Sequence, residues 1–260
     1  MKVFCVANQK GGVGKSTTAD ALAAYFKAEP WNLRVLAIDL DSQCNLTWAH
    51  GIDPNELSVT VREVLSGEAD IKKAIVKGRV DIIPASAHVA VTDDMFGSKR
   101  KERRLKKLLS ELEDDYDVVV LDTPPALGLM SVNALVAADV LVIPGQADPF
   151  TLKGIEEIFK TAQIVKEGPN PDLIIGGVVI TRHNPRINIA RQALEVIGEI
   201  AQANGTKVFG TCIRECTALK EAQAMEKSIF EYAPRSNAAK DYRKVFDELM
   251  EGLNSQLTPG

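Results

Sequence analysis

The sequence predicts an α/β fold: a single-domain, mostly parallel twisted sheet with helices on both faces. Apolar, strand-like runs alternate with segments of helical periodicity along the chain. Most of these runs are continuously apolar, which is typical of strands buried on both faces of a parallel sheet. The 260 residues contain no fixed-period repeat, no Ser/Gly-rich linker and no composition break. We therefore expect one domain over residues 1–260.

The elements follow in order from this pattern. The first strand is expected at residues 2–7, where an apolar run ends in a glycine-rich turn, and the first helix runs from Ser16 to a stop at Pro30. Further strands are expected at residues 33–40, 80–84, 118–121, 140–144, 173–181 and 207–213. Further helices are expected at residues 59–65, 103–112, 132–138, 152–167, 189–204 and 238–253. In such a sheet, ligands bind at the carboxyl ends of the strands.

Composition narrows the class of protein. A chain that is 45% hydrophobic and 25% charged can bury a core, and a net charge of −4 argues against a surface that is basic all over. No apolar run reaches the roughly 18 residues of a membrane span, and no signal peptide is visible, so we expect a cytoplasmic protein. The four cysteines are scattered, which favours reduced thiols over a disulfide framework or a zinc site.

A basic run occupies residues 99–107, with seven Lys or Arg residues interrupted by Glu102 and Leu105. Because Leu105, Leu108 and Leu109 recur at helical spacing, we interpret the run first as the solvated face of an amphipathic helix. A DNA-binding or partner-binding role is the alternative.

The strongest motif is the glycine-rich segment of residues 10–17, which lies between the first strand and the first helix. The glycines let the backbone fold around a polyphosphate and direct N–H groups at it, beside the positive end of the helix. Lys15 is expected to reach the β and γ oxygens, and Ser16 to offer a hydroxyl to Mg²⁺. The generic pattern has Gly where this chain has Gln9. The predicted nucleotide-binding residues are Lys10, Gly11, Gly12, Val13, Gly14, Lys15, Ser16 and Thr17.

Three aspartates are expected beside this loop. Asp39 and Asp41 end one predicted strand, and Asp122 ends another that should lie next to it. The carboxylates should therefore converge near the γ-phosphate. The three histidines fall in no nucleophile-like motif.

Residues 8–18, 35–43 and 118–125 resemble the ParA family of partition ATPases, and the similarity spans nearly the whole chain. The resemblance implies a P-loop NTPase of the deviant Walker A type, a group that includes MinD and the nitrogenase iron protein. The mark of this group is a lysine early in the loop, which corresponds to Lys10. The resemblance further implies a homodimer that binds ATP between its two subunits. In that dimer Lys10 would reach the phosphates bound by the partner subunit.

The resemblance also implies roles for the acids. Asp122 corresponds to the Walker B carboxylate, Asp39 to a residue that holds magnesium waters, and Asp41 to one that orients the attacking water. The implied catalytic residues are thus Lys10, Lys15 and Asp41, and the implied metal residues are Ser16, Asp39 and Asp122. Residues 123–125 would form a second switch. The family commonly has Pro where this chain has Ser42.

The function implied is slow, Mg²⁺-dependent ATP hydrolysis in DNA partition. The ATP dimer would bind DNA without sequence preference, and a ParB-like partner would stimulate hydrolysis and release. Such a protein is associated with the nucleoid. The candidate DNA-binding residues are Arg186, Arg235 and Lys240, with Arg243 nearby, and the candidate adenine loop is Ile213, Arg214 and Glu215.

Three alternatives share this fold. A MinD-like membrane cycle needs a basic amphipathic terminal helix, whereas residues 246–253 are acidic. A metal-cluster carrier needs cysteines that ligate a cluster across a dimer, and Cys212 and Cys216 are isolated and late in the chain. A biosynthetic ligase needs a substrate pocket that the sequence does not reveal. Because the chain starts at the first strand, we expect no N-terminal helix-turn-helix extension.

Overall fold

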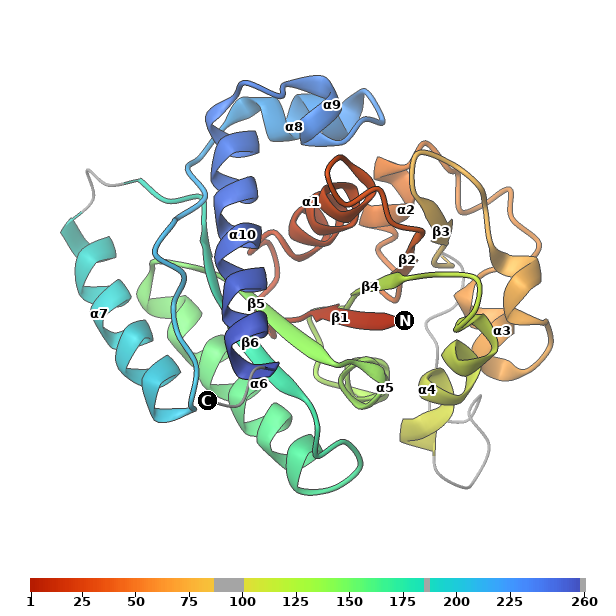
Figure 1. The fold of residues 1–260 in the computed structure, drawn as a ribbon, viewed down its shortest axis with the longest axis horizontal. Helices are drawn as coiled ribbons and strands as arrows, with labels where there is room; N and C mark the ends of the chain where they lie inside the picture. The colour runs from red at the N-terminus through yellow and green to blue at the C-terminus, as the bar shows by residue number, and fades with distance from the viewer. Residues whose placement is uncertain (87–100, 185–187, 258–260) are drawn as a thin grey trace.

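The sheet has six strands in the order β3-β2-β4-β1-β5-β6, and all of its strand pairs are parallel. The computed structural model describes residues 1–86, 101–184 and 188–257 (Figure 1). The strands are β1 Lys2–Val6, β2 Val35–Asp39, β3 Asp81–Ile83, β4 Val118–Asp122, β5 Val140–Gln146 and β6 Ile174–Thr181. Parallel strands cannot be joined by tight hairpins, so longer crossovers connect them.

Helices make most of these crossovers. They are α1 Lys15–Lys27, α2 Asn45–Ala49, α3 Val61–Ser66, α4 Arg104–Leu109, α5 Leu129–Ala137, α6 Pro149–Glu167, α7 Asn188–Ala203, α8 Thr217–Ala224, α9 Ile229–Tyr232 and α10 Asn237–Leu257. Short 3-10 helices lie at Ile71–Ala74, Lys101–Arg103 and Ser110–Leu112. Each of the described helices is too short or too polar to cross a membrane.

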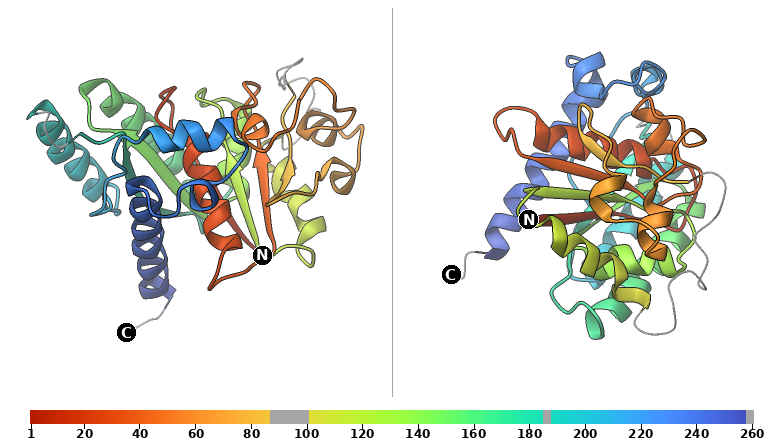
Figure 2. Two further views of the ribbon diagram at one scale, coloured as in Figure 1. Left: turned by 90° about the horizontal axis from the view of Figure 1, so that it is seen from above. Right: turned by 90° about the vertical axis from the view of Figure 1, so that its right-hand side faces the viewer.

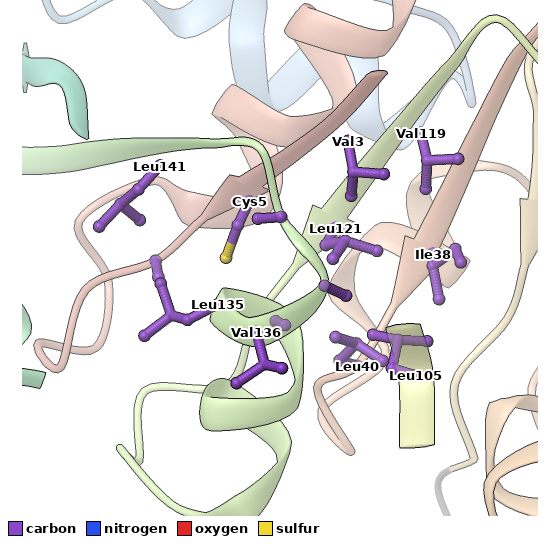
Figure 3. Packing of buried hydrophobic residues seen from close by; sticks show 14 of the residues in the cluster. Val3, Cys5, Ile38, Leu40, Leu105, Val119, Leu121, Leu135, Val136 and Leu141 are labelled. Atoms are coloured by element: carbon purple, nitrogen blue, oxygen red, sulfur yellow. The ribbon is translucent and has the colours of Figure 1, made fainter. Parts of the chain in front are cut away.

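The molecule has three layers, with helices on both faces of the sheet (Figures 1 and 2). Successive strand residues alternate between two apolar clusters: Val3 and Cys5 belong to the one under α3 to α7, and Phe4 and Val6 to the one under α1, α2 and α8 to α10. Figure 3 shows the first cluster, where Cys5 of β1 lies among leucines and valines of neighbouring elements. Burial on both faces explains why the strands are continuously apolar.

The strand order places the loop after β1 at a topological switch point. From β1 the chain passes through α1 to β2, which lies beyond β4, whereas α5 leads from β4 to β5 on the other side of β1. The connections therefore diverge at the carboxyl end of β1, where this class of sheet binds ligands. The fold class predicted from the sequence is confirmed.

The strand predicted at residues 207–213 is wrong. This segment runs beside β6 and bridges it at Val178 and Val208, and further on the N–H of Ile213 donates to Ile180 at 2.7 Å. Between these two contacts the backbone N–H groups of Gly210 and Thr211 donate to the Glu248 carboxylate of α10, at 2.7 and 3.1 Å. Because the N–H of Thr211 is taken from the ladder, the pairing is interrupted and this segment forms no continuous strand.

The helix predicted at residues 103–112 is divided into a 3-10 turn, α4 and a second 3-10 turn. Its amphipathic character is confirmed, because Leu105 and Leu109 are buried while Lys106 and Lys107 are exposed. The first two residues of the basic run lie outside the described residues. The sequence did not indicate α2, α8 or α9, which are short.

Candidate functional site

The loop between β1 and α1 has the backbone of an anion-binding turn. Gly12 and Gly14 have φ of 76° and 86°, a region that L-residues with a side chain rarely adopt. Gly14 is the N-cap of α1, and within the described chain no side chain caps this end and no acid lies in its first turn. The first N–H groups of α1 and its positive dipole end are therefore directed at the loop.

Polar side chains tie the loop to the sheet. The buried Asn8 donates to the carbonyl of Pro144 at 2.7 Å and accepts from the N–H of Lys10 at 3.0 Å. The Thr181 hydroxyl lies 2.8 Å from the carbonyl of Val13, and the Gln146 amide donates to that of Gly12 at 3.1 Å. The loop is thus fixed to β5 and β6 and is preorganised for its ligand.

Beside the loop is a cavity of about 460 Å³, within the range of small-molecule sites. It is open to solvent and gathers residues from the loop, from the segment after β2, from the segment after β4 and from the C-terminal third of the chain. Its described lining is Gly11, Gly12, Gly14, Lys15, Ser16, Thr17, Asp41, Gln43, Asn45, Trp48, Ala49, Pro125, Arg182 and Gln223. Most of the residues predicted for phosphate binding therefore face one space. Lys10, Val13, Asp39 and Asp122 are not part of this described lining.

Lys15 is the buried cation of the cavity. Only 7% of the residue is exposed, and its ammonium donates to the carbonyl of Lys10 at 3.2 Å. Burial lowers the pKa of Lys15, and the charges of Asp122 and Asp41 oppose that shift. A polyphosphate placed in the cavity would add the negative charge that this ammonium needs.

Asp39 and Asp122 are direct neighbours on adjacent strands, as the sequence predicted, because they are register partners in the β2–β4 pair. Both are fully buried. Burial raises the pKa of Asp39 to about 6, although the backbone N–H and hydroxyl of Thr47 and the N–H of Asp41 all donate to its carboxylate. Both oxygens of Asp39 are thereby occupied by donors from the segment that follows β2.

Asp122 differs from its neighbour. Neither of its carboxylate oxygens has a hydrogen-bond partner among the residues that the structure describes. Burial raises its pKa well above the usual range and the charge of Asp39 adds to the shift. The Ser16 hydroxyl and the charge of Lys15 oppose this rise in the pKa of Asp122. Ser16 nevertheless does not meet the geometry of a hydrogen bond to the Asp122 carboxylate.

This unpartnered carboxylate is the feature that a bound cation would satisfy. A buried carboxylate without a partner is costly, and oxygen ligands beside a phosphate site are what Mg²⁺ prefers. The Asp122 carboxylate and the Ser16 hydroxyl thus fit a magnesium ion held next to a polyphosphate. Asp39 fits a supporting role, since its oxygens already accept three bonds from Thr47 and Asp41.

Asp41 faces the cavity from the turn that follows β2. Its carboxylate accepts the N–H of Gln43 at 3.0 Å, and its carbonyl accepts that of Cys44 at 2.8 Å. These bonds hold the turn without a proline at Ser42. Asp41 is 6% exposed and lines the same cavity as the loop, where its carboxylate can accept a hydrogen bond from a water.

Lys10 points away from the cavity of its own chain. Its ammonium contacts the Asp148 carboxylate at 2.8 and 2.9 Å and the Thr151 hydroxyl at 2.9 Å, and its side chain is 27% exposed. Asp148 precedes α6, and this helix comes close to the loop: a Cβ on Gly154 would lie 2.8 Å from the Asn8 side chain. The ammonium is therefore held at the edge of the site.

The remaining candidates are dispersed. Arg235, two residues before α10, and Lys240, in its first turn, are exposed, and Arg186 lies outside the described residues. Ile213, Arg214 and Glu215 are absent from the described lining of the cavity, and Arg214 pairs with Asp241 at 2.6 Å. Cys212 and Cys216 are half-buried free thiols, and no group of three or more metal-binding side chains forms within the described part of the chain.

Sequence reasoning missed several residues of the site. Asp148 and Thr151 follow β5, and only the three-dimensional contact with Lys10 singles them out. Trp48, Arg182 and Gln223 line the cavity from distant segments. In the sequence, only the position of Trp48 shortly after Asp41 indicates that one of these residues could lie at the site.

The chain is similar to known proteins over nearly its whole length. A family model described as an AAA domain matches residues 1–175. The chain is 35% identical over 252 residues to the sporulation initiation inhibitor protein Soj of Bacillus subtilis, covering 95% of this chain and 98% of that one. It is 32% identical over 254 residues to the chromosome partitioning protein ParA of Myxococcus xanthus, covering 96% and 88%.

The chain is also similar to a solved structure, that of a cobyrinic acid a,c-diamide synthase from Mycobacterium smegmatis with a bound ATP analogue and magnesium. Its TM-score is 0.83 at 31% identity, and the match covers 98% of this chain and 97% of that one.

Proposed function

The chain belongs to the ParA/Soj family of AAA-domain ATPases, and on that premise we propose that it is a DNA partition ATPase whose ATP-bound dimer binds DNA. It is an ATPase that uses ATP and Mg²⁺. The single observation that carries the site assignment is the buried Asp122 carboxylate, which has no hydrogen-bond partner among the described residues, next to a phosphate loop that lines one cavity.

The residues of this chain divide the work of hydrolysis. The loop N–H groups and Lys15 would bind the β and γ phosphates, and Ser16 and Asp122 would hold the magnesium ion. The ion held there would supply positive charge beside the phosphates. Asp41 orients a water molecule whose oxygen bonds to the γ phosphorus while the bond to the β–γ bridging oxygen breaks, giving ADP and phosphate. Asp39 holds the segment that follows β2 through Thr47.

Lys10 is the residue that we propose joins two subunits. Its ammonium lies at the rim, outside the lining of its own cavity and partly exposed. From there it would reach the phosphates bound by a second copy, where a positive charge stabilises the transition state as an arginine finger does. Hydrolysis then depends on dimerisation. Residues 123–125 follow Asp122, and Pro125 lines the cavity, so this segment would couple the phosphate to the dimer face.

The dimer would bind DNA through exposed basic residues, Arg235 and Lys240 among them, and we include Arg186 in this face. Phosphate contacts of this kind carry no sequence information and weaken steeply with salt. We propose that a ParB-like partner stimulates hydrolysis and releases the DNA, and that the protein works on the nucleoid in the cytoplasm.

The experiment that tests this function is a gel shift with random-sequence DNA and Mg²⁺ plus ATP, ADP or no nucleotide. We expect binding with ATP and little without it. The variant Asp41→Ala should bind DNA with ATP as a stable dimer that size-exclusion chromatography detects, because its hydrolysis is blocked. DNA binding that ignores the nucleotide, or an Asp41→Ala chain that stays monomeric with ATP, would refute the proposal.

The same measurements address the other functions of this fold. A biosynthetic enzyme, such as the synthase of the similar mycobacterial structure, would show no nucleotide-dependent DNA binding in the gel shift. A MinD-like protein would co-sediment with anionic liposomes in ATP, and the acidic residues Asp247, Glu248 and Glu251 of α10 oppose that attraction.

A further inference from the structure

Three residues of the cavity wall belong to neither the phosphate loop nor the acid-bearing turns. They are Trp48 in the last turn of α2, Arg182 just after β6, and Gln223 in α8. These segments are distant in sequence, yet α2 packs against α8 beside the start of α1 (Figure 2). Gln223 donates to the Thr17 hydroxyl at 3.1 Å, so this wall continues directly from the last residue of the loop.

Trp48 is the unusual member. Its neighbours Leu46 and Ala49 are buried at 0% and 5% exposure, whereas Trp48 is 48% exposed and borders the cavity. An indole offers a large, rigid, apolar face, and leaving it in water forfeits the free energy of burying that area. A flat ligand group placed against it would recover that energy.

The other two residues supply polar groups at the same wall. Arg182 has φ of 49°, a left-handed conformation that is strained for a residue with a side chain. The backbone around it is fixed, because Thr181 is tied to the loop and the N–H of His183 donates to Ile213 at 2.9 Å. Such strain, held by its surroundings, is characteristic of ligand sites.

We propose that Trp48 is the platform on which the purine base of the nucleotide stacks, with Arg182 and Gln223 at the edge of the base or its ribose. This inference rests on the nucleotide binding of the proposed function and assigns the part of the site that holds the base. It replaces the loop at Ile213, Arg214 and Glu215, which the sequence suggested for adenine. Arg214 of that loop is already committed to Asp241.

Tryptophan fluorescence tests the stacking directly. The second tryptophan, Trp31, packs against Tyr25 and Phe26 and is absent from the described lining of the cavity, so Trp31→Phe leaves Trp48 as the single reporter. Titration with Mg-ADP should quench this emission, because a stacked base quenches an indole. Mg-tripolyphosphate carries the phosphates without a base and should compete with ADP while leaving the emission unchanged. ADP is chosen because the proposed dimer requires a triphosphate.

Affinity gives an independent readout. Trp48→Ala should raise the Kd for Mg-ADP about tenfold, because the stacking contact with the base is lost, and should leave the Kd for tripolyphosphate unchanged. Trp48→Phe should retain most of the affinity, and Trp31→Ala is the matched control that removes an indole elsewhere. Calorimetry measures all of these constants, and circular dichroism confirms that each variant folds.

Three outcomes would overturn the platform, and ADP binding without any quenching is the first of them. The second is equal quenching by tripolyphosphate and ADP, which would mean that Trp48 senses the phosphate loop. The third is a Trp48→Ala chain that binds ADP as tightly as the parent. If the parent chain bound neither ATP nor ADP, the proposed function would fail as well, whereas ADP binding without quenching refutes the platform alone.

Discussion

The ammonium of Lys10 and the carboxylate of Asp148 lie 2.8 Å apart although 138 residues separate them in the sequence. The pair joins the phosphate loop to the segment that opens α6, and the Thr151 hydroxyl completes the contact. In the single chain the ammonium is therefore held in place by its own subunit. The role that we propose for Lys10 between subunits requires this contact to open or to turn.

The first prediction concerns that contact. Asp148→Asn removes a charge from a pair whose side chains are 27% and 28% exposed. The interaction between the two side chains should therefore weaken by about 1 kcal/mol. Freed from the pair, Lys10 should reach a second subunit more readily, and the basal ATPase rate at fixed protein concentration should rise about fivefold. A phosphate-release assay at several protein concentrations measures this. Glu157→Gln, which removes the ion pair with Lys160 on α6, is the control. If the ATPase rate of Asp148→Asn instead fell as far as that of Lys10→Ala, the contact between Lys10 and Asp148 would be required for hydrolysis.

The second prediction concerns the buried carboxylate of Asp122, whose pKa is raised in the folded chain. A raised pKa means that the native state retains the proton longer than the unfolded state, so the stability of the free protein decreases as pH rises through that pKa. Asp122→Asn removes this loss. We expect the variant to be more stable than the parent by about 1 to 3 kcal/mol at pH 8, with a gap that shrinks towards pH 4.

Urea unfolding of the nucleotide-free proteins with EDTA checks the Asp122→Asn prediction, and the variant should hydrolyse no ATP. Asp114→Asn, a change of an exposed aspartate in the turn before β4, is the control and should not stabilise the chain at pH 8. A variant that is less stable than its parent at pH 8 would contradict the account of Asp122.

The third prediction concerns the close approach of α6 to the loop. A Cβ at residue 154 would lie 2.8 Å from Asn8 Oδ1 and 3.3 Å from the backbone nitrogen of Lys10. Gly154→Ala should therefore displace the loop, with a loss of about 1 to 3 kcal/mol in stability and weaker ADP binding. Thermal unfolding and calorimetry measure the two effects.

Gly198→Ala in α7 is the matched control for Gly154→Ala. An added Cβ there meets nothing within 4 Å, so the variant should gain up to about 1 kcal/mol from helix propensity. Equal behaviour of the two glycine variants would mean that α6 does not constrain the loop.

The fourth prediction compares two basic regions. Reversing the charges of Arg235 and Lys240 to Glu should weaken ATP-dependent DNA binding and reduce the slope of log K against log salt by about one unit for each DNA phosphate that is no longer neutralised. The double variant Lys106→Glu with Lys107→Glu changes the net charge equally, on the exposed side of α4. It should leave the slope unchanged. The opposite result would move the DNA face to α4. Filter binding from low to moderate salt makes the comparison.

Local pattern in the chain is sufficient to predict the architecture and the phosphate end of the site. Continuous apolar strands require burial on both faces, and the glycines at 12 and 14 are needed where φ is positive. The neighbouring positions of Asp39 and Asp122 followed from strand order, because the carboxyl ends of adjacent parallel strands share an edge. Each of these properties depends on residues that are close together in the sequence or on a general rule of parallel sheets.

The meeting of distant groups is visible only in the folded chain. The contact of Lys10 with Asp148, the donation of Thr47 to Asp39 and the wall made by Trp48, Arg182 and Gln223 join segments that no periodicity connects. The absence of a strand at residues 207–213 has the same origin, since the Glu248 carboxylate takes the N–H of Thr211, which a ladder with β6 would need. Local spacing fixes the period of an element, whereas long-range hydrogen bonds and packing fix what each exposed group finally contacts.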